Sequence, residues 1–161
     1  MANHDQIIGA IEDVDQRLEE LWDRILDNAD TPLAEGTWRV RDALSHLAAR
    51  GNGVARVMAR ARALKDPNAP QPPTPRSIDE INADQVAERS TKSVRELLDE
   101  IIAGHAAAIA AVREVDRVEL REMIPMGFQP GEIEVGDSII RGGPRHDHGH
   151  LDQIEAVLPA E

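Results

Sequence analysis

The sequence predicts an all-α fold, a four-helix bundle with one short extra helix, and three observations support this. Apolar residues recur at spacings of three and four along several long segments, the pattern of amphipathic helices. Two Trp and one Phe are the only aromatic residues, so Leu, Ile, Val and Ala must fill the core, which suits close helix packing. A proline-rich segment near the middle of the chain is long enough to join two neighbouring helices that run parallel.

The first half of the chain predicts two long helices. The first is expected over about residues 3–28, with an apolar stripe made of Ile11, Val14, Leu18, Leu21 and Ile25. Residues 29–37 contain proline and glycine and predict a loop. The second helix is expected to begin at Thr37 or Trp38 and to continue through Gly51 to about Ala61. Gly51 lies on the apolar stripe, where it permits close helix approach at a cost of roughly 1 kcal/mol relative to alanine.

The second half begins with a crossover. Residues 66–76 hold five of the ten prolines, which excludes a regular element. This segment is interpreted as a connection within one domain over residues 1–161, because neither flank would make a domain alone. Ser77 and Glu80 then predict a capping box for a short helix over residues 78–89.

Two more long helices complete the expected bundle. The third follows Thr91 or Ser93, and its apolar seam contains Val94, Leu98, Ile101, His105, Ala108, Val112 and Val115. Residues 119–136 predict a loop with a short strand at 133–135. The last helix is expected from Asp137 or Ser138 to about residue 158. Pro144 follows two glycines inside it, so it either kinks this helix or starts a shorter one.

Charge and composition exclude several classes of function. Thirty acidic against eighteen basic residues give a net charge of −12, which disfavours sequence-independent binding of nucleic acid. Arg50, Arg56, Arg60 and Arg62 are interpreted as a solvated helix face. The absence of cysteine excludes disulfides and thiolate–metal sites. No segment reaches the roughly 20 apolar residues that span a bilayer, and no signal peptide is evident, so a cytoplasmic protein without a membrane partner is expected.

Three of the six histidines indicate a metal site. His146 and His150 stand four residues apart, which places both imidazoles on one helix face, where they can bind one cation. Such a pair also occurs by chance near surface helix ends. His46 strengthens the metal interpretation, because Asp42 lies one turn before it and is expected to accept a hydrogen bond from its ring. The alternatives are a core histidine for His46 and a solvated charge for Asp42.

The other histidines receive different interpretations. His148 is expected to point away from the pair, since it lies about 200° around the helix from His146. His105 lies on an apolar seam and is interpreted as a hydrogen-bonded core histidine rather than a fourth ligand. His4, near the N-terminus, is given no functional role.

Two motifs resemble a known family. The pattern W-x-x-x-D-x-x-x-H-L is formed by Trp38, Asp42, His46 and Leu47. It resembles the second helix of the DinB/YfiT-like superfamily, which includes the bacillithiol transferases and the N-terminal domain of mycothiol-dependent maleylpyruvate isomerase. The pattern H-x-x-x-H-L-x-Q-I resembles the last helix of that superfamily and is formed by His146, His150, Leu151, Gln153 and Ile154. The resemblance covers nearly the whole chain and implies three metal ligands, matching His46, His146 and His150, with further positions open to water or substrate.

Such a site predicts Lewis-acid chemistry. Three neutral imidazoles leave a divalent ion its full charge, so bound water has its pKa lowered toward ~7 in favourable zinc sites, and a thiol would ionise similarly. Zn, Ni, Fe and Co all suit histidine ligands. The expected function is therefore a metal-dependent hydrolase, or a transferase that uses a low-molecular-weight thiol, acting on a small molecule. Asp147 and Asp152 are weaker candidates for acid–base or supporting roles.

Two alternatives remain open from the sequence. One is a small-molecule binding or sequestering protein on the same bundle, without catalysis. The other is a purely structural oligomer. A homodimer is compatible with this type of fold, but no sequence feature requires it.

Overall fold

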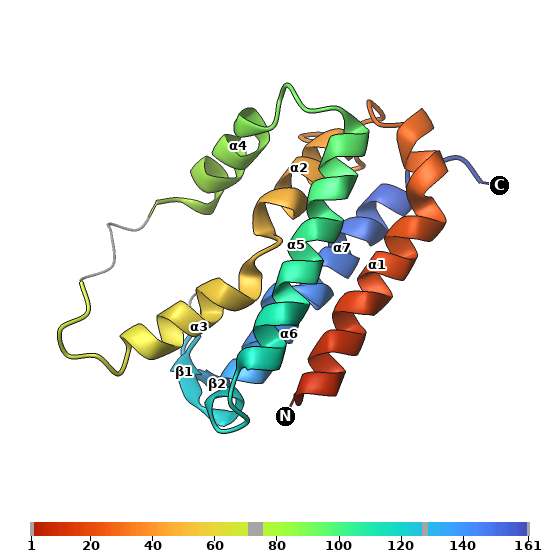
Figure 1. The fold of residues 1–161 in the computed structure, drawn as a ribbon. Helices are drawn as coiled ribbons and strands as arrows, with labels where there is room; N and C mark the ends of the chain where they lie inside the picture. Colours follow the sequence, from red (N-terminus) through yellow and green to blue (C-terminus); the bar gives the residue numbers. More distant parts are fainter. Residues whose placement is uncertain (1, 71–75, 127–128, 161) are drawn as a thin grey trace.

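The computed structural model describes residues 2–70, 76–126 and 129–160, and shows a helical bundle with a small hairpin at one end (Figure 1). Four helical arms make up the bundle: α1 (His4–Asp27), α2 (Val40–Arg50) with α3 (Gly53–Ala63), α5 (Val94–Glu114), and α6 (Val135–Gly142) with α7 (Pro144–Glu155). The short extra helix is α4 (Ile78–Glu88). The all-α bundle predicted from the sequence is therefore confirmed.

The arms follow the order up, down, down, up. In Figure 1, α2, α3 and α5 run downward, whereas α1, α6 and α7 run upward. The parallel arms α2 and α5 pack against each other, and so do the parallel arms α1 and α7. The expected parallel pair on either side of the proline-rich crossover is thus confirmed, although residues 71–75 of the crossover lie outside the described residues.

Local capping explains where the helices begin. Asn3 and Gln6 form a capping box at α1, and Ser77 with Glu80 forms the one predicted at α4. Of the two alternatives for the start of α5, Ser93 is the cap, with Glu96 as its partner. In each box two backbone N–H groups that lack helical partners are satisfied by side chains.

The second predicted helix is in fact broken, which corrects the continuous helix expected from 37 to 61. α2 ends at Arg50 and α3 begins at Gly53. At the break Gly51 lies against Gly104 of α5, so closely that a Cβ on Gly104 would stand 2.6 Å from the Cα of Gly51. The close approach that Gly51 permits is confirmed, and the change of direction follows it.

The last predicted helix is also divided. α6 ends at Gly142, Gly143 has φ −112° and ψ −106°, and α7 begins at Pro144. Proline suits a first helical turn, where its missing N–H would have no partner. Of the two expectations for Pro144, the start of a shorter helix is the one observed.

The two breaks separate two apolar cores. One core joins the upper parts of α1 and α5 to α2 and α7, and includes Leu18, Leu44, Leu98, Leu151 and Ile154. The other joins their lower parts to α3 and α6, and includes Ile7, Ile11, Met58, Val112 and Ile139. Each fully buried side chain of this size contributes about 1.5–3 kcal/mol. Two buried polar side chains, His105 and Asp147, belong to neither core.

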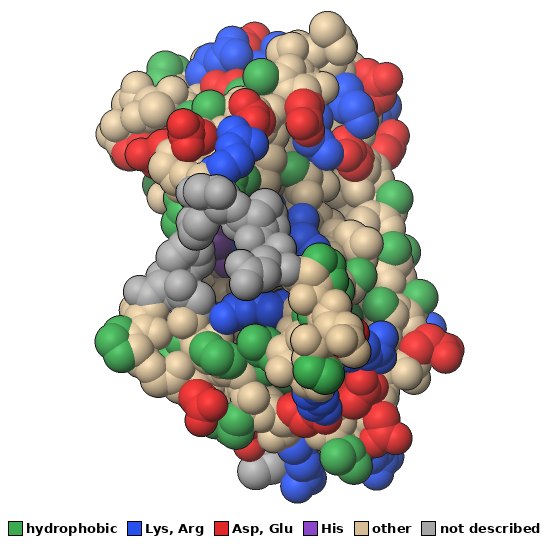
Figure 2. Space-filling view, turned by 90° about the vertical axis from the view of Figure 1, so that its left-hand side faces the viewer, with side chains coloured by type: hydrophobic (Ala, Val, Ile, Leu, Met, Phe, Trp, Pro, Cys, Tyr) green, Lys and Arg blue, Asp and Glu red, His purple; other side chains and the backbone are tan. Residues whose placement is uncertain are grey.

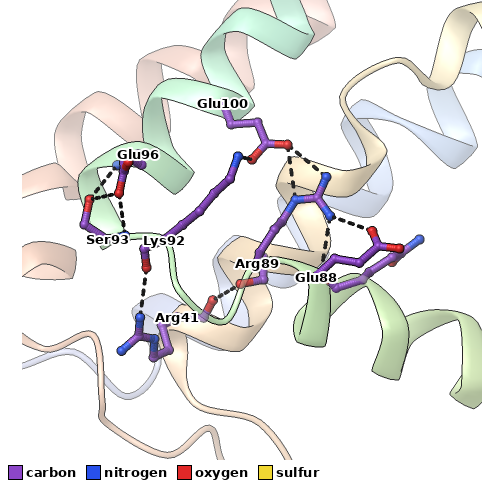
Figure 3. Close-up of polar contacts among 9 residues, drawn as sticks. Arg41, Glu88, Arg89, Lys92, Ser93, Glu96 and Glu100 are labelled. Atoms are coloured by element: carbon purple, nitrogen blue, oxygen red, sulfur yellow. Dashed lines mark hydrogen bonds and ion pairs between the residues drawn. The ribbon is translucent and has the colours of Figure 1, made fainter.

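Helix α4 is held over α2 by polar contacts around the turn that follows it (Figure 3). Arg89 and Lys92 donate to the Glu100 carboxylate at 2.8 and 2.7 Å. Arg41 of α2 donates to the backbone oxygen of Lys92 at 3.0 Å. These contacts place the side of α4 that carries Gln85 above α2.

A short hairpin closes the lower end of the bundle. After the 3₁₀ turn Glu119–Arg121, strand β1 (Met123–Pro125) pairs antiparallel with β2 (Glu132–Glu134). The predicted strand at 133–135 is shifted by one residue, and its partner β1 was not predicted. None of the described helices is long and apolar enough to cross a membrane.

Candidate metal centre

Three histidines from two helices converge between α2 and α7. The Nε2 atom of His146 lies 3.3 Å from Nε2 of His46 and 3.3 Å from Nε2 of His150. His46 is buried in the middle of α2, and the other two lie one turn apart near the start of α7. The predicted residues are therefore brought together, and one potential ligand atom from each lies within 4.8 Å of the others.

Each ring has an oxygen at its other nitrogen. The Nδ1 atom of His46 lies 2.8 Å from Oε1 of Gln85, and that of His150 lies 2.9 Å from Oε1 of Gln153. The Nδ1 atom of His146 lies 3.0 Å from Oδ1 of Asp147. These oxygens accept from an N–H at each Nδ1, so in a neutral ring the Nε2 atom that faces the other histidines is the one with the free lone pair.

Asp42 does not accept a hydrogen bond from His46, and that prediction is wrong. Its carboxylate accepts from the backbone N–H of Arg39 at 3.0 Å and from the Arg39 guanidinium. Asp42 is the third residue of α2, where carboxylates pair with free N–H groups of the helix start. Side chains also lean toward the N-terminus of a helix, which carries Asp42 away from His46. The acceptor is Gln85 instead.

The electrostatic surroundings keep two of the rings neutral. Burial, together with the neighbouring His150, His146 and Arg50, lowers the pKa of His46 to about 4 despite the bond with Gln85. Burial also lowers the pKa of His150. Neutral imidazoles are the form that binds metal ions.

Behind His146 lies a buried chain of polar groups. The second oxygen of Asp147 lies 3.5 Å from Nε2 of His105, and Nδ1 of His105 contacts Asp15 of α1. Burial by itself lowers the pKa of His105, but the bonds with Asp147 and Asp15 outweigh it and raise the pKa to about 9. For the acid Asp147 burial has the opposite effect and raises the pKa, but the bonds with His105 and His146 outweigh it and bring the pKa below its usual value.

The positions of His105, Asp147 and Asp152 in the structure can be compared with their sequence interpretations. His105 is a hydrogen-bonded core histidine and lies outside the three-histidine cluster, as predicted. Asp147, a weaker candidate for acid–base or supporting work, is buried against His146, and its role stays a prediction. Asp152 is exposed and pairs with Arg17 at 2.7 Å, away from the cluster.

Two further histidines point elsewhere. The ring of His148 lies 3.4 Å from Arg17 of α1, on the other side of α7, as its position around the helix predicted. His4 contacts the backbone oxygen of Val115 at 2.8 Å. Neither belongs to the cluster.

Trp38 covers part of the cluster. Its ring stacks on His150 with centroids 5.9 Å apart and an angle of 30°, and it packs against His46 at 5.2 Å. Trp38 precedes α2 rather than opening it, because the helix begins at Val40 with Arg39 as its cap.

A cavity of about 480 Å³ opens beside the three histidines. Arg50 and Arg60 line it together with Gln85 of α4. The interpretation of the arginines as a solvated face is therefore wrong for Arg50, which is half-buried, and incomplete for Arg60, which is exposed but borders the cavity.

Two site residues escaped the sequence interpretation. Gln85 lies on the same face of α4 as Ile78 and Ile81, since the three are spaced by three and four residues, and a polar residue on that face was a usable signal. Asp15 contacts His105, which lies 90 positions later in the sequence, and no local pattern indicates this contact.

Comparison with known proteins supports the family resemblance. Residues 6–154 match the DinB superfamily. No curated protein matches the chain. An uncharacterized protein from Clostridium difficile 630 has a similar structure, with a TM-score of 0.74 and 14% identity over 97% of this chain and 95% of that one.

Two other solved structures share the fold. YfiT from Bacillus subtilis, described as a probable metal-dependent hydrolase with an unusual four-helix bundle topology, has a TM-score of 0.71 and 20% identity, over 96% of this chain and 85% of its own. A mycothiol-dependent maleylpyruvate isomerase has a TM-score of 0.69 and 17% identity, and the match covers 98% of this chain but 65% of that enzyme. With the superfamily match extending over residues 6–154, the chain belongs to the DinB superfamily.

Proposed function

We propose that the chain binds one divalent metal ion through His46, His146 and His150 and uses it to act on a small molecule, as a metal-dependent hydrolase or a thiol-dependent transferase. The observation that carries the proposal is the arrangement of the ring nitrogens. The three Nε2 atoms face one another, and an oxygen lies within hydrogen-bond distance of each Nδ1, which favours the tautomer with a free lone pair at each Nε2. Lone pairs that converge in this way repel one another unless a cation lies among them.

The donor set fits such an ion. Three imidazoles with their other nitrogens held by Gln85, Asp147 and Gln153 reproduce the supporting contacts that metal-binding histidines require. Because no charged ligand is included, a bound divalent ion keeps its full charge, and it would acidify a water molecule or thiol for nucleophilic attack. Zn, Ni, Fe and Co all suit these donors.

The remaining residues of the site provide orientation and access. Trp38 packs on His46 and His150, which limits the movement of both rings. The cavity of about 480 Å³ lies beside the cluster and is within the size range of small-molecule sites. A substrate in that cavity reaches the three histidines directly.

The similar structures favour these two reaction classes. YfiT is described as a probable metal-dependent hydrolase, and the maleylpyruvate isomerase depends on mycothiol, a thiol. The second candidate function is a small-molecule binding protein without catalysis, which the same cavity would serve.

Metal content of purified variants tests the centre. We expect about one ion per chain in the wild type and a large loss in His46→Ala and His146→Ala. His148→Ala is the matched control, because this residue lies between the two α7 histidines but contacts Arg17. Stoichiometric metal that persists in His46→Ala would exclude the three-histidine site.

Activity separates the two functional candidates. The wild type is assayed with ester and amide substrates and with thiols and electrophilic acceptors. Turnover that a chelator abolishes and added metal restores supports the enzyme. Metal binding without any turnover in this panel favours the binding protein.

A further inference from the structure

We propose that the cavity beside the three histidines recognises an anionic group, a carboxylate or a phosphate, through Arg60 and Arg141, with Arg50 at its inner wall. This inference rests on the proposed function, since the anion would anchor a small molecule whose reacting atom lies at the histidines. It adds a substrate class to that site.

The charged side chains that line the cavity are positive, whereas the net charge of the whole chain is negative. The chain carries 30 acidic and 18 basic residues. Among the described residues that line the cavity, however, there are three arginines and three histidines but no Asp or Glu. Figure 2 shows the same contrast, with Lys or Arg side chains beside the hollow in which a histidine is visible.

None of the three arginines forms an ion pair among the described residues, although the buried Asp147 carboxylate attracts Arg50 from a longer distance. Arg50 donates to the backbone oxygen of Gly142 at 2.6 Å, and its buried Nε has no hydrogen-bond partner in the described part of the chain. Arg60 donates to the backbone oxygen of Pro125, also at 2.6 Å. The side chain of Arg141 makes no hydrogen bond or ion pair within residues 2–70, 76–126 and 129–160.

Several other arginines of the described chain form ion pairs, whereas none of the three that line the cavity does. Arg62 lies two residues after Arg60 and binds Glu119 at 2.9 Å. Arg76 binds Asp84, and Arg89 binds Glu100. Three guanidinium groups without an ion pair in the described part of the chain thus line one cavity of a strongly acidic protein. A planar guanidinium binds carboxylate and phosphate oxygens in a two-pronged geometry.

The rest of the lining suits the carbon skeleton of a small ligand. Ile78 and Ile81 of α4 are exposed large apolar side chains that face the cavity, and Ile133 of the hairpin lies on its wall. The amide side chains of Asn82 and Gln129 supply neutral hydrogen-bonding groups. A compact anion with an apolar portion matches this combination.

Isothermal titration calorimetry with two matched probes tests the proposal. Succinate carries the charge, and succinamide has nearly the same shape without it. Inorganic phosphate is the third probe and distinguishes a phosphate preference from a carboxylate preference. All three are titrated into the full chain, both after chelation of metal and after loading with zinc.

Variants of the two outer arginines assign the binding to the cavity. We expect Arg60→Gln/Arg141→Gln to weaken succinate or phosphate binding about 10-fold or more, the scale of a lost charge-assisted hydrogen bond. Arg60→Lys/Arg141→Lys, which keeps the charge, should retain part of the affinity. Arg113→Gln is the control, because Arg113 is exposed on α5 and does not line the cavity.

The results separate this inference from the metal proposal. Equal binding of succinate and succinamide, no binding of either anion, or unchanged affinity in the double Gln variant would overturn the anion site even if zinc binds. Arginine-dependent anion binding by chelated protein would support the anion site even if the wild type holds no metal.

Discussion

The Asp147 carboxylate lies 3.0 Å from the His146 ring, at the nitrogen that does not face the other two histidines. Its second oxygen lies 3.5 Å from His105. One buried carboxylate thus connects a candidate ligand on α7 to a histidine of α5, and through Asp15 to α1. The candidate metal centre and the packing of the bundle share this group.

Asp147→Asn should weaken zinc binding roughly 10- to 100-fold, the range typical for loss of a residue that supports a metal ligand. The amide cannot supply the same charged acceptor to Nδ1 of His146. Competition with a chromogenic chelator measures the affinity. Asp152→Asn is the control, since Asp152 is exposed on the same helix and pairs with Arg17. Equal affinities in the two variants would mean that Asp147 does not support His146.

Gln85→Ala should also reduce zinc affinity, by about 10-fold, because it removes the acceptor of the His46 N–H. Gln85→Glu keeps an acceptor oxygen and should bind zinc at least as tightly as the wild type. The same competition assay applies to both. If the Gln85→Ala and Gln85→Glu variants bound zinc with the same affinity, the contact with His46 would have no role in zinc binding.

His105 should make the stability of the metal-free protein fall as the pH rises. The pKa of His105 is about 9 in the folded chain and about 6.5 unfolded, so between these values the folded state binds more protons. Its contribution is complete below about pH 6.5 and is lost by about pH 9, a change on the order of 3 kcal/mol.

Urea unfolding at several pH values between 6 and 9.5 measures this effect. In His105→Gln, the decrease over that interval should be smaller than in the wild type. A wild-type free energy of unfolding that is flat or rises from pH 6.5 to 9 would contradict a protonated His105.

Gly104→Ala should destabilise the fold by about 1–3 kcal/mol, the usual cost of overpacking. The new Cβ would meet the backbone of Gly51 at 2.6 Å, and backbone atoms cannot move aside locally. Gly9→Ala, at a helix position with nothing within 4 Å, should instead be neutral or stabilising by up to roughly 1 kcal/mol. Thermal or urea unfolding compares the two, and similar effects of both substitutions would exclude the close contact as their cause.

Local features of the sequence were enough to predict the four helical arms of the bundle, though not the breaks within two of them, and to identify the three histidines. The apolar stripe of α1 and the capping box at Ser77 depend on residues within a few positions of one another, so they can be identified without a structure, whereas the choice of Ser93 over Thr91 came from the structure. The spacing of His146 and His150 is local in the same sense. His46 was added through its motif, and its convergence with the pair is confirmed, while metal binding stays a prediction.

Features that depend on distant residues were decided only by the tertiary structure. The second arm bends at Gly51 because Gly104 packs there, and His46 is oriented by Gln85, 39 residues later, rather than by the nearby Asp42. By itself the sequence determined the helical periodicity, the capping box at Ser77 and the histidine spacing, because these arise within one or two helical turns. The partners of each ring nitrogen and the unpaired arginines of the cavity were decided by packing between helices, which brings together groups that no local pattern relates.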